Sequence, residues 1–442
     1  MLRAHHLTSL HGTGRTIRAA LRIQQTDAFG LTSMSLLSSR TLRATAFGLA
    51  VGLAAPVQAQ DSIVLTTAVP FLQIEPDSRA AGMGMTGVAL ADNAYAVFWN
   101  PAGLGNQTGT EVSFTHAPWL PALGADLSYE YLAGKYSLGS AGTVGGHLTY
   151  FNLGEQQATN ESGDPLGNFR SYELSTGVSY GKAVTPNLSV GTGVRFVYSS
   201  LTGGAIVEEA QTSAGVSFGV DLGVMYRGPE LGLGQSSRPT FAFSLANVGP
   251  GISYTENSEF SDAIPTTLRF GTALDTRLDD FNRVTLALDF NKVLVSRDSV
   301  GGYDPVVKAL FSSWGSRVVN TRAGQRDPST GNFITCENLA ADTDESNNCD
   351  SLGALQQLTL GAGLEYWYND LLALRGGYFF EDPANGNRQF LTAGAGIRYS
   401  LVGVDMSYIY ALAEDSPVAN QLRFSLLLNI PRSGETRACR TG

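Results

Sequence analysis

The chain has 442 residues, enough for two or three ordinary soluble domains, yet it contains 51 glycines and only 15% charged residues. This composition favours a glycine-rich all-β protein over a helical one. The net charge of −10 argues against a nucleic-acid partner, because nucleic-acid binding requires a basic face.

The first 59 residues have the pattern of a targeting segment. Basic residues precede an apolar run over 44–57, and Val57-Gln58-Ala59 offers a small-residue cleavage site. This order is typical of a secretory signal peptide. A transmembrane anchor is less favoured, because the run is shorter than the ~20 residues that a spanning helix needs. We predict a leader and signal peptide over 1–59, with Met34 as the true start or with the residues before it as a dispensable extension.

Residues 60–109 do not alternate as a strand would, and they are dense in small side chains. The stretch 80–85 reads Ala-Ala-Gly-Met-Gly-Met, and Trp99-Asn100-Pro101-Ala102 adds a turn signal near the end. Small residues at this density let backbone segments pack closely in a confined space. The sequence therefore predicts a compactly packed segment without strands.

Fourteen stretches after residue 109 alternate apolar and polar side chains. In one of them Leu358, Leu360 and Leu364 face one way, while Thr359 and Glu365 face the other. A period of two predicts β-strands with one apolar and one polar face. The predicted strands are 110–117, 127–138, 143–152, 171–182, 188–199, 212–226, 239–248, 265–275, 282–292 and five more within 354–431.

Strand length and link length indicate how these strands assemble. Most strands are close to the ~9–11 residues that cross a bilayer at a tilt, whereas strands of globular proteins average about 5–6 residues. Short links alternate with long polar ones such as 153–170, 249–264 and 293–353. That alternation is typical of outer-membrane barrels, with the long loops outside and both termini periplasmic. We predict a 14-stranded antiparallel transmembrane β-barrel over 110–431 and a periplasmic tail over 432–442; a secreted β-sandwich is the less favoured alternative.

Aromatic side chains gather near the strand ends. They include Trp367, Phe379, Tyr399 and Tyr410. Outer-membrane barrels carry such side chains in girdles at both membrane interfaces. We therefore expect the girdles to include Tyr366, Trp367, Tyr368, Tyr378, Phe379, Phe380, Tyr399, Tyr408 and Tyr410.

The polar face carries glycine, serine and threonine, with occasional single charges. Six charges of both signs come from successive strands near the C-terminus: Glu365, Arg375, Glu381, Arg398, Asp405 and Arg423. Inside a barrel they would face the lumen, where they can pair across strands or hold the N-terminal segment. We favour structural ion pairing over a ligand site.

The link 293–353 is the longest in the chain. Apolar positions within 304–317 recur at near-helical spacing, which predicts a short amphipathic helix. Cys336 and Cys349 are candidates for a local disulfide if the compartment is oxidising. The acidic run 342–345 matches no complete calcium-binding loop, so a solvated acidic loop is favoured over a metal site. A long extracellular loop on a rigid barrel is a reasonable place to meet a partner.

No catalytic constellation is evident. After the leader the chain has two histidines, His116 and His147, and it lacks a Gly-x-Ser-x-Gly nucleophile elbow and a His-Glu-x-x-His zinc motif. Gly82-Met83-Gly84 does not follow a strand and open a helix, as a phosphate-binding loop would. We predict a protein that is not an enzyme and that holds no metal or cofactor.

Two blocks of sequence carry a family resemblance. The first runs from Val69-Pro70-Phe71 to Gly82-Met83-Gly84 and includes Trp99-Asn100-Pro101-Ala102. The second comprises Glu365-Tyr366-Trp367-Tyr368-Asn369, Leu374-Arg375-Gly376-Gly377-Tyr378-Phe379, Gly386-Asn387-Arg388 and 416–424. Together they resemble the PorV/PorQ family, the outer-membrane barrels of the type IX secretion system within the FadL-like superfamily. The first block alone indicates only the superfamily, and the 320–350 region departs from the usual family sequence.

The resemblance implies both an architecture and a role. Residues 60–109 would plug the lumen, and the candidate contact residues are Arg79, Gly82, Gly84, Asn100 and Pro101. The barrel would lie among the lipids of the outer membrane and dock on the large translocon barrel (SprA/Sov-like). It would bind the C-terminal signal domain of secreted cargo and pass that cargo to the surface attachment complex (PorU-like).

Two other functions remain as alternatives. One is a FadL-like transporter of hydrophobic small molecules, which requires an apolar pocket, whereas the strands turn glycine, serine and single charges inward. The other is an open diffusion porin, which requires an unobstructed lumen that the small-residue segment 70–104 would block.

Overall fold

The computed structural model describes residues 67–121, 126–159, 165–201, 206–207, 210–211, 214–254, 261–296, 303–320, 349–413, 416 and 418–430. All of them fall within the unit Val57–Gly442. The predicted leader, Cys336, the acidic run 342–345 and the predicted C-terminal tail lie outside the described residues.

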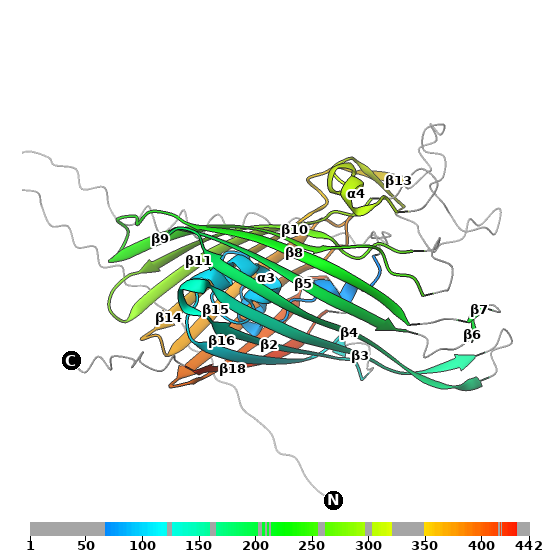
Figure 1. Ribbon diagram of the computed structural model, residues 1–442, viewed down its shortest axis with the longest axis horizontal. Helices are drawn as coiled ribbons and strands as arrows, with labels where there is room; N and C mark the ends of the chain where they lie inside the picture. The colour runs from blue at the N-terminus through cyan, green and yellow to red at the C-terminus, as the bar shows by residue number, and fades with distance from the viewer. Residues whose placement is uncertain are drawn as a thin grey trace, which may run out of the picture. The chain divides into compact units, whose positions relative to one another are not determined.

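Fourteen antiparallel strands close into one barrel, which confirms the predicted fold class (Figure 1). They are β1 (Thr110–Pro118), β2 (Ser128–Ser137), β3 (Thr143–Thr159), β4 (Pro165–Ala183), β5 (Leu188–Ser200), β8 (Gly215–Arg227), β9 (Ser236–Val248), β10 (Thr267–Arg277), β11 (Asn282–Val293), β14 (Leu358–Tyr368), β15 (Leu372–Glu381), β16 (Gln389–Tyr399), β17 (Val402–Ala411) and β18 (Gln421–Ile430). Each strand pairs with the next barrel strand along the chain, and β1 also pairs with β18. Closure leaves no sheet edge, so backbone hydrogen bonds within the barrel are satisfied between strands.

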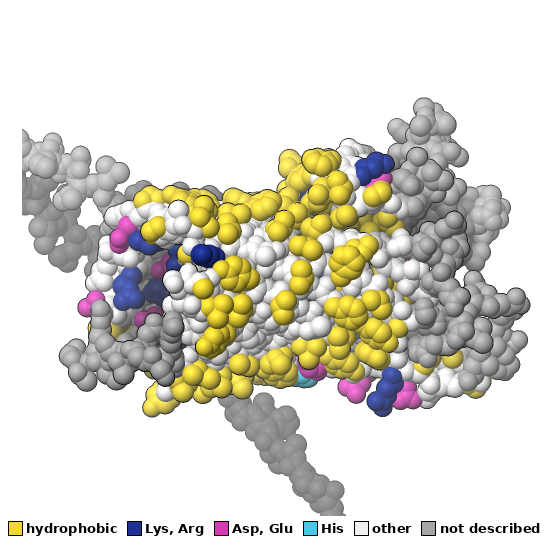
Figure 2. All heavy atoms as spheres, viewed as in Figure 1, with side chains coloured by type: hydrophobic (Ala, Val, Ile, Leu, Met, Phe, Trp, Pro, Cys, Tyr) yellow, Lys and Arg dark blue, Asp and Glu magenta, His cyan; other side chains and the backbone are white. Residues whose placement is uncertain are grey.

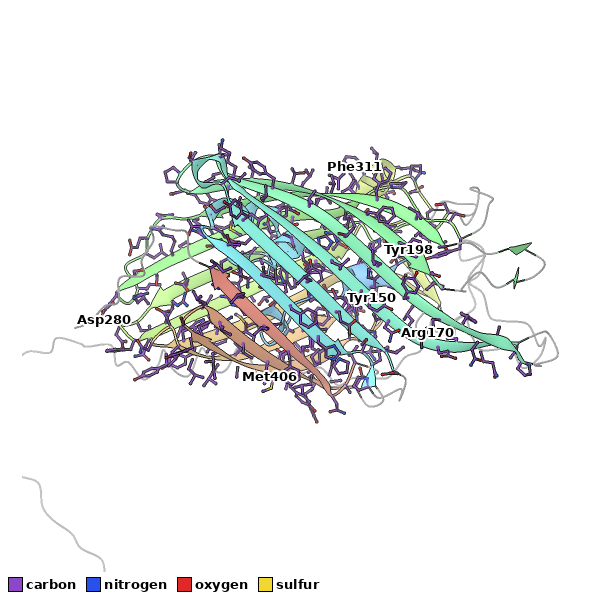
Figure 3. The ribbon with its side chains drawn as sticks, turned by 60° about the horizontal axis from the view of Figure 1, so that its bottom comes forward. Tyr150, Arg170, Tyr198, Asp280, Phe311 and Met406 are labelled. Carbon is purple, nitrogen blue, oxygen red and sulfur yellow. The ribbon has the colours of Figure 1, made fainter. Side chains whose placement is uncertain are left out.

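The outer wall of the barrel is apolar. Along β18 the side chains of Phe424, Leu426 and Leu428 are exposed, while Ser425 and Leu427 between them are buried. The same alternation runs through the other strands, and Figure 2 shows apolar side chains over much of the visible wall. Figure 3 shows Met406 of β17 on that outer side. A wall of this kind suits contact with lipid.

The links between strands differ at the two ends of the barrel. Links at one end are short, such as 184–187 and 369–371, and we call this the short-turn end. Asn369 and Asp370 have φ of 55° and 49°, as the tight turn of a twisted hairpin requires. The opposite, long-loop end carries the larger links, including the one between β11 and β14. Strand β1 begins at the short-turn end, and strand β18 ends there.

Small elements fill part of the longer links. The link between β11 and β14 contains α4 (Val306–Ser312), where a short helix was expected, and the paired strands β12 (Arg317–Asn320) and β13 (Cys349–Leu352). The strands β6 (Ile206–Val207) and β7 (Ala210–Gln211) form a second small pair. In the part of the chain that the structure describes, no helix is long and apolar enough to cross a membrane.

The predicted aromatic girdle needs one correction. Tyr399 and Tyr410 point outward and are exposed, but Trp367 and Phe379 are buried on the inner side. The reason is the period of two: Trp367 lies between the outward Tyr366 and Tyr368, so it has the opposite direction. Assigning aromatic residues to the girdle by proximity to strand ends ignored this alternation.

Candidate functional site

Residues 67–109, which we call the inner segment, lie among the barrel strands (Figure 1). They form four short helical turns: η1 (Pro70–Gln73), α2 (Ser78–Ala81), α3 (Ala96–Trp99) and η2 (Pro101–Asn106). Asp77 caps α2 by accepting from the Ala80 amide at 2.6 Å, and it also accepts from the Trp99 indole at 2.6 Å. Burial raises the pKa of this carboxyl.

Asn100 joins the inner segment to β8 and β9. Its side-chain oxygen accepts from the Ala102 amide at 3.0 Å and caps η2, while Pro101 supplies the first residue of that turn. Its amide nitrogen donates to the carbonyl oxygens of Val224 and Phe243, at 3.1 and 3.3 Å. One asparagine thus shapes the turn and binds it to the barrel wall.

Glycines allow the inner segment to touch the backbone of the barrel. Gly84 has φ of 67°, and a Cβ there would lie 2.5 Å from the carbonyl oxygens of Ala362 and Tyr378. A Cβ on Gly377 of β15 would lie 2.1 Å from the Gly84 nitrogen. Gly82 has the same relation to Gly394 of β16, with 3.0 Å to its Cα. At Gly84 and Gly377 a side chain larger than hydrogen would overlap backbone atoms, whereas at Gly82 it would require Gly394 to shift slightly.

Gly377→Ala is expected to weaken the fold by about 1–3 kcal/mol, because the new methyl group overlaps the Gly84 backbone. The measurement is the urea midpoint of the purified barrel. Gly376→Ala is the matched control, since a Cβ there has its nearest neighbour at 4.0 Å. Equal midpoints for the two variants would contradict the close approach.

Asp289 of β11 holds the middle of the inner segment. Its Oδ2 accepts from the backbone amides of Gly87 and Val88, at 2.7 and 2.9 Å, and the residue is fully buried. Charged acceptors make stronger hydrogen bonds than neutral ones. The carboxylate therefore fixes a stretch of backbone that has no regular secondary structure.

Asp289→Ala is expected to cost about 1–3 kcal/mol, because two buried amides lose their acceptor. Hydrogen exchange followed by mass spectrometry should show faster exchange at Gly87 and Val88. Asp279→Ala provides the control, since Asp279 also accepts from two backbone amides but lies in an exposed turn. Unchanged protection of the inner segment in Asp289→Ala would count against this anchor.

A chain of buried ion pairs links the inner segment to four strands. Arg79 binds Glu365 of β14 through two hydrogen bonds, at 2.9 and 2.8 Å. Arg375 of β15 donates to Glu365 and to Asp405 of β17, each at 2.7 Å. Arg398 of β16 completes the chain with Asp405, at 2.5 Å. The side chains of Glu365 and Arg375 are fully buried. We call these five residues the charge network.

The other two predicted lumen charges lie outside this network. Arg423 donates to the Glu75 carbonyl oxygen and to Gln421, so it also contacts the inner segment. Glu381 pairs with Arg388 at 2.6 Å, in the link that follows β15. All six predicted charges therefore have partners in the structure.

Sequence analysis did not single out three further groups on the inner face. These are Asp289, the buried Arg195–Asp221 pair at 2.5 Å, and Arg269, which donates to the Phe98 carbonyl oxygen at 2.7 Å. The sequence feature that could have identified them is the one that identified the C-terminal charges. Each residue is a single charge on the glycine-rich or polar face of a strand.

A cavity of about 410 Å³, which we call the outer cavity, lies between the inner segment and strand ends at the long-loop end. Its aromatic lining is Phe71, Trp99, Trp119, Phe151 and Phe379. Its charged lining is Glu75, Arg269, Lys292, Glu381 and Arg388. A pocket with apolar walls and a few charged groups suits an amphipathic ligand or side chain.

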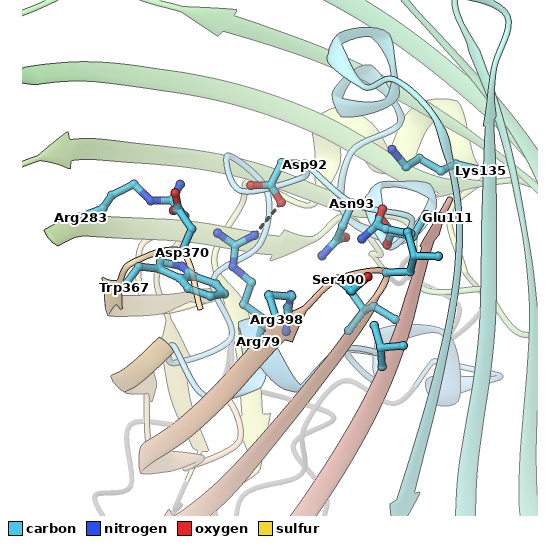
Figure 4. A pocket seen from close by; sticks show the side chains of 14 residues that line it. Arg79, Asp92, Asn93, Glu111, Lys135, Arg283, Trp367, Asp370, Arg398 and Ser400 are labelled. Carbon is cyan, nitrogen blue, oxygen red and sulfur yellow. Dashed lines mark hydrogen bonds and ion pairs between the residues drawn. The ribbon is translucent and has the colours of Figure 1, made fainter. Parts of the chain in front are cut away.

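A second pocket of about 290 Å³ lies at the short-turn end (Figure 4). Its lining mixes Arg79, Arg283 and Arg398 with Asp92 and Asp370. In Figure 4 Arg79 points toward Asp92, to which it is bonded at 2.6 Å. Most of the lining charges form pairs with each other, so this pocket extends the charge network to the solvent.

Metal-ligating side chains do not cluster in the described part of the chain. Among them no group of three or more His, Cys, Asp or Glu side chains is placed to hold a metal ion. Cys349 opens β13 opposite Asn320. Its proposed partner Cys336 lies outside the described residues, so the disulfide stays a prediction.

Comparison with known proteins places the chain in a family. A family model described as "Type IX secretion system protein PorV" matches residues 57–299, a little over half of the chain. No curated protein gives a match.

Solved structures that resemble the chain include three outer-membrane proteins. The Ralstonia pickettii toluene transporter TbuX has 16% identity and a TM-score of 0.42, with 80% of this chain and 99% of that one covered. The Pseudomonas putida toluene transporter TodX has 15% identity and 0.39, with 80% and 96% covered. A Pseudomonas aeruginosa FadL homologue has 12% identity and 0.38, with 84% and 99% covered. At these values the likeness says nothing about substrate or partners.

Proposed function

The chain belongs to the PorV family of type IX secretion system proteins, and from this membership we propose that it is an outer-membrane docking subunit for secreted proteins. In this role it docks on the translocon barrel, binds the C-terminal signal domain of cargo and delivers cargo to the surface attachment complex. The family match is the observation that carries the proposal.

The barrel supports such a role because its interior holds the inner segment in place. Anchors from several strands hold the inner segment: Asp289, Asn100, the glycine contacts and the charge network. A docking protein needs a fixed frame that presents loops, and loops on a rigid scaffold commonly carry binding residues. We place the long-loop end outside the cell and both termini in the periplasm, as in other outer-membrane barrels.

The link between β15 and β16 is a suitable contact surface for cargo or translocon. The Asp382 carboxylate accepts from the backbone amide of Ala384 at 2.9 Å. Arg388, at the end of the link, forms an ion pair with Glu381 at its start, at 2.6 Å. Asn385 also donates to Glu381, at 3.1 Å. The link is thus ordered before any partner arrives, which lowers the entropy cost of binding.

The test is affinity purification of the tagged chain from detergent-solubilised outer membrane. We expect recovery of a large barrel protein, a secreted protein with its C-terminal domain, or both. Replacing residues 382–387 with glycine and serine should reduce this recovery. Replacing 278–281 in a short turn is the control, and it should leave recovery unchanged. Bound lipid without any protein partner would contradict the proposal.

A second candidate function is transport of hydrophobic small molecules. The aromatic lining of the outer cavity favours it, because five aromatic side chains there offer an apolar binding surface. Uptake of a hydrophobic compound by vesicles that contain the purified barrel would support transport. Binding without uptake would leave the cavity as a site that holds a ligand or partner side chain.

A further inference from the structure

Helix α4 turns its apolar side away from the protein. Val307 and Phe311 are four residues apart and lie along one side of the helix, and Trp314 follows in the turn after its end; they are 68%, 77% and 44% exposed. The opposite side, which is buried, consists of Ala309 and Ser313. An amphipathic helix of a water-soluble surface has the reverse arrangement.

Polar contacts hold the end of α4 at the long-loop rim of the barrel. The Lys292 ammonium lies 5.2 Å from the centre of the Trp314 ring and donates to Gln357 at 2.8 Å. Gln357 in turn donates to the Gly315 carbonyl oxygen at 3.0 Å. Lys292 and Gln357 are both buried and line the outer cavity, so these contacts tie the end of α4 to the rim of the barrel at the long-loop end. Figure 1 shows α4 itself outside the outline of the barrel strands, so the helix is not folded into the lumen.

The position along the barrel matches a membrane boundary. Tyr150, Tyr172 and Tyr198 form a row of outward aromatic rings with 5.9 Å between neighbouring centres. Tyrosines in such a row are typical of the girdle at lipid headgroups. Figure 3 shows Phe311 at a similar level along the barrel as Tyr150 and Tyr198. The exposed side of α4 is thus level with the lipid boundary at the long-loop end.

We propose that α4 is an interfacial lipid anchor whose exposed Val307, Phe311 and Trp314 enter the adjacent lipid leaflet. Leu355, 81% exposed just before β14, adds to the same contact. Lipid is the occupant that the position favours, because the apolar side continues the lipid-facing wall shown in Figure 2. Anchoring at this point fixes both ends of the longest link of the barrel against the membrane.

Tryptophan fluorescence can test this directly. The chain has four tryptophans, and Trp99 and Trp367 are buried inside the barrel, while Trp119 packs against Tyr129 and Phe151 there. The full chain would be placed in phosphatidylcholine vesicles with plain or brominated acyl chains, since bromine quenches nearby indoles. We expect brominated vesicles to quench the fluorescence, and Trp314→Phe to abolish most of that loss.

A matched pair of variants separates insertion from mere proximity. Phe311→Asp should sharply reduce quenching of Trp314, whereas Phe311→Leu, which keeps the side apolar, should retain it. Retained heat-modifiable gel migration would establish that both barrels are folded. Quenching that is absent in the unaltered protein, or equal in the two folded variants, would overturn the proposal and assign the apolar side to a protein partner.

Discussion

Replacing Arg375 with methionine is expected to lower the free energy of unfolding by about 3–5 kcal/mol, the range for removing one member of a buried ion pair. Arg375 is fully buried and is the only member of the charge network that binds two carboxylates within the barrel strands, those of Glu365 and Asp405. Its loss leaves both carboxylates with one fewer donor in a water-poor interior. The measurement is the urea midpoint of the folded barrel.

Two variants define what the Arg375 result means. Arg398→Met removes the end of the network, where the side chain is 22% exposed, and should cost much less because solvent can replace part of the contact. Arg375→Lys keeps the charge but loses the planar fork that reaches both carboxylates, so an intermediate midpoint is expected. If Arg375→Met and Arg398→Met unfold together at the original midpoint, the network does not stabilise the barrel.

Placing an arginine at Leu426 is expected to cost about 2–4 kcal/mol in a bilayer, the range for a lipid-facing charge at the membrane midplane. Leu426 is exposed near the middle of β18 and pairs with Phe114 of β1 and Val404 of β17. The charged guanidinium group would lie in the hydrocarbon core of the bilayer, without water or a carboxylate to stabilise it. Folding titrations in lipid vesicles measure this loss.

The position of the charge along the strand provides the control. Ile430, at the short-turn end of β18, is also exposed, and an arginine there can reach water. Ile430→Arg should therefore cost only about 0–1 kcal/mol. Equal losses at the two positions would mean that β18 does not span the lipid as proposed.

Alternation predicted all fourteen barrel strands because lipid on one side and a packed interior on the other impose a period of two on the sequence. Alternation did not predict the full length of two strands at the long-loop end: β3 extends to Thr159, and β4 already begins at Pro165. There the two strands project past the other strands at the long-loop end, as Figure 3 shows near Arg170. Water on both faces removes the apolar period, so only hydrogen bonding marks these residues as strand.

The site was predictable in its residue types but not in its pairings. The inner-face charges stood out because isolated charges on a glycine-rich face are unusual. Which of them meet depends on strand register: Glu365 lies directly opposite Arg375, whereas Asp405 lies opposite Gly396. Register depends on turn geometry and on the packing of the inner segment, and the latter has no sequence period from which it could be derived.

The pairing of β1 with β18 has a consequence for how the molecule is made. At this seam the hydroxyl groups of Thr115 and Ser425, 310 positions apart, meet at 2.7 Å, and Ser425 also accepts from the Ser78 amide at 3.0 Å. Bringing chain segments together over such a distance is the entropically costliest contact of the sheet, so the seam should form last. A chain that ended before β18 would lose its seam and one anchor of the inner segment together. It would assemble as an open, edge-exposed sheet and not as a narrower barrel.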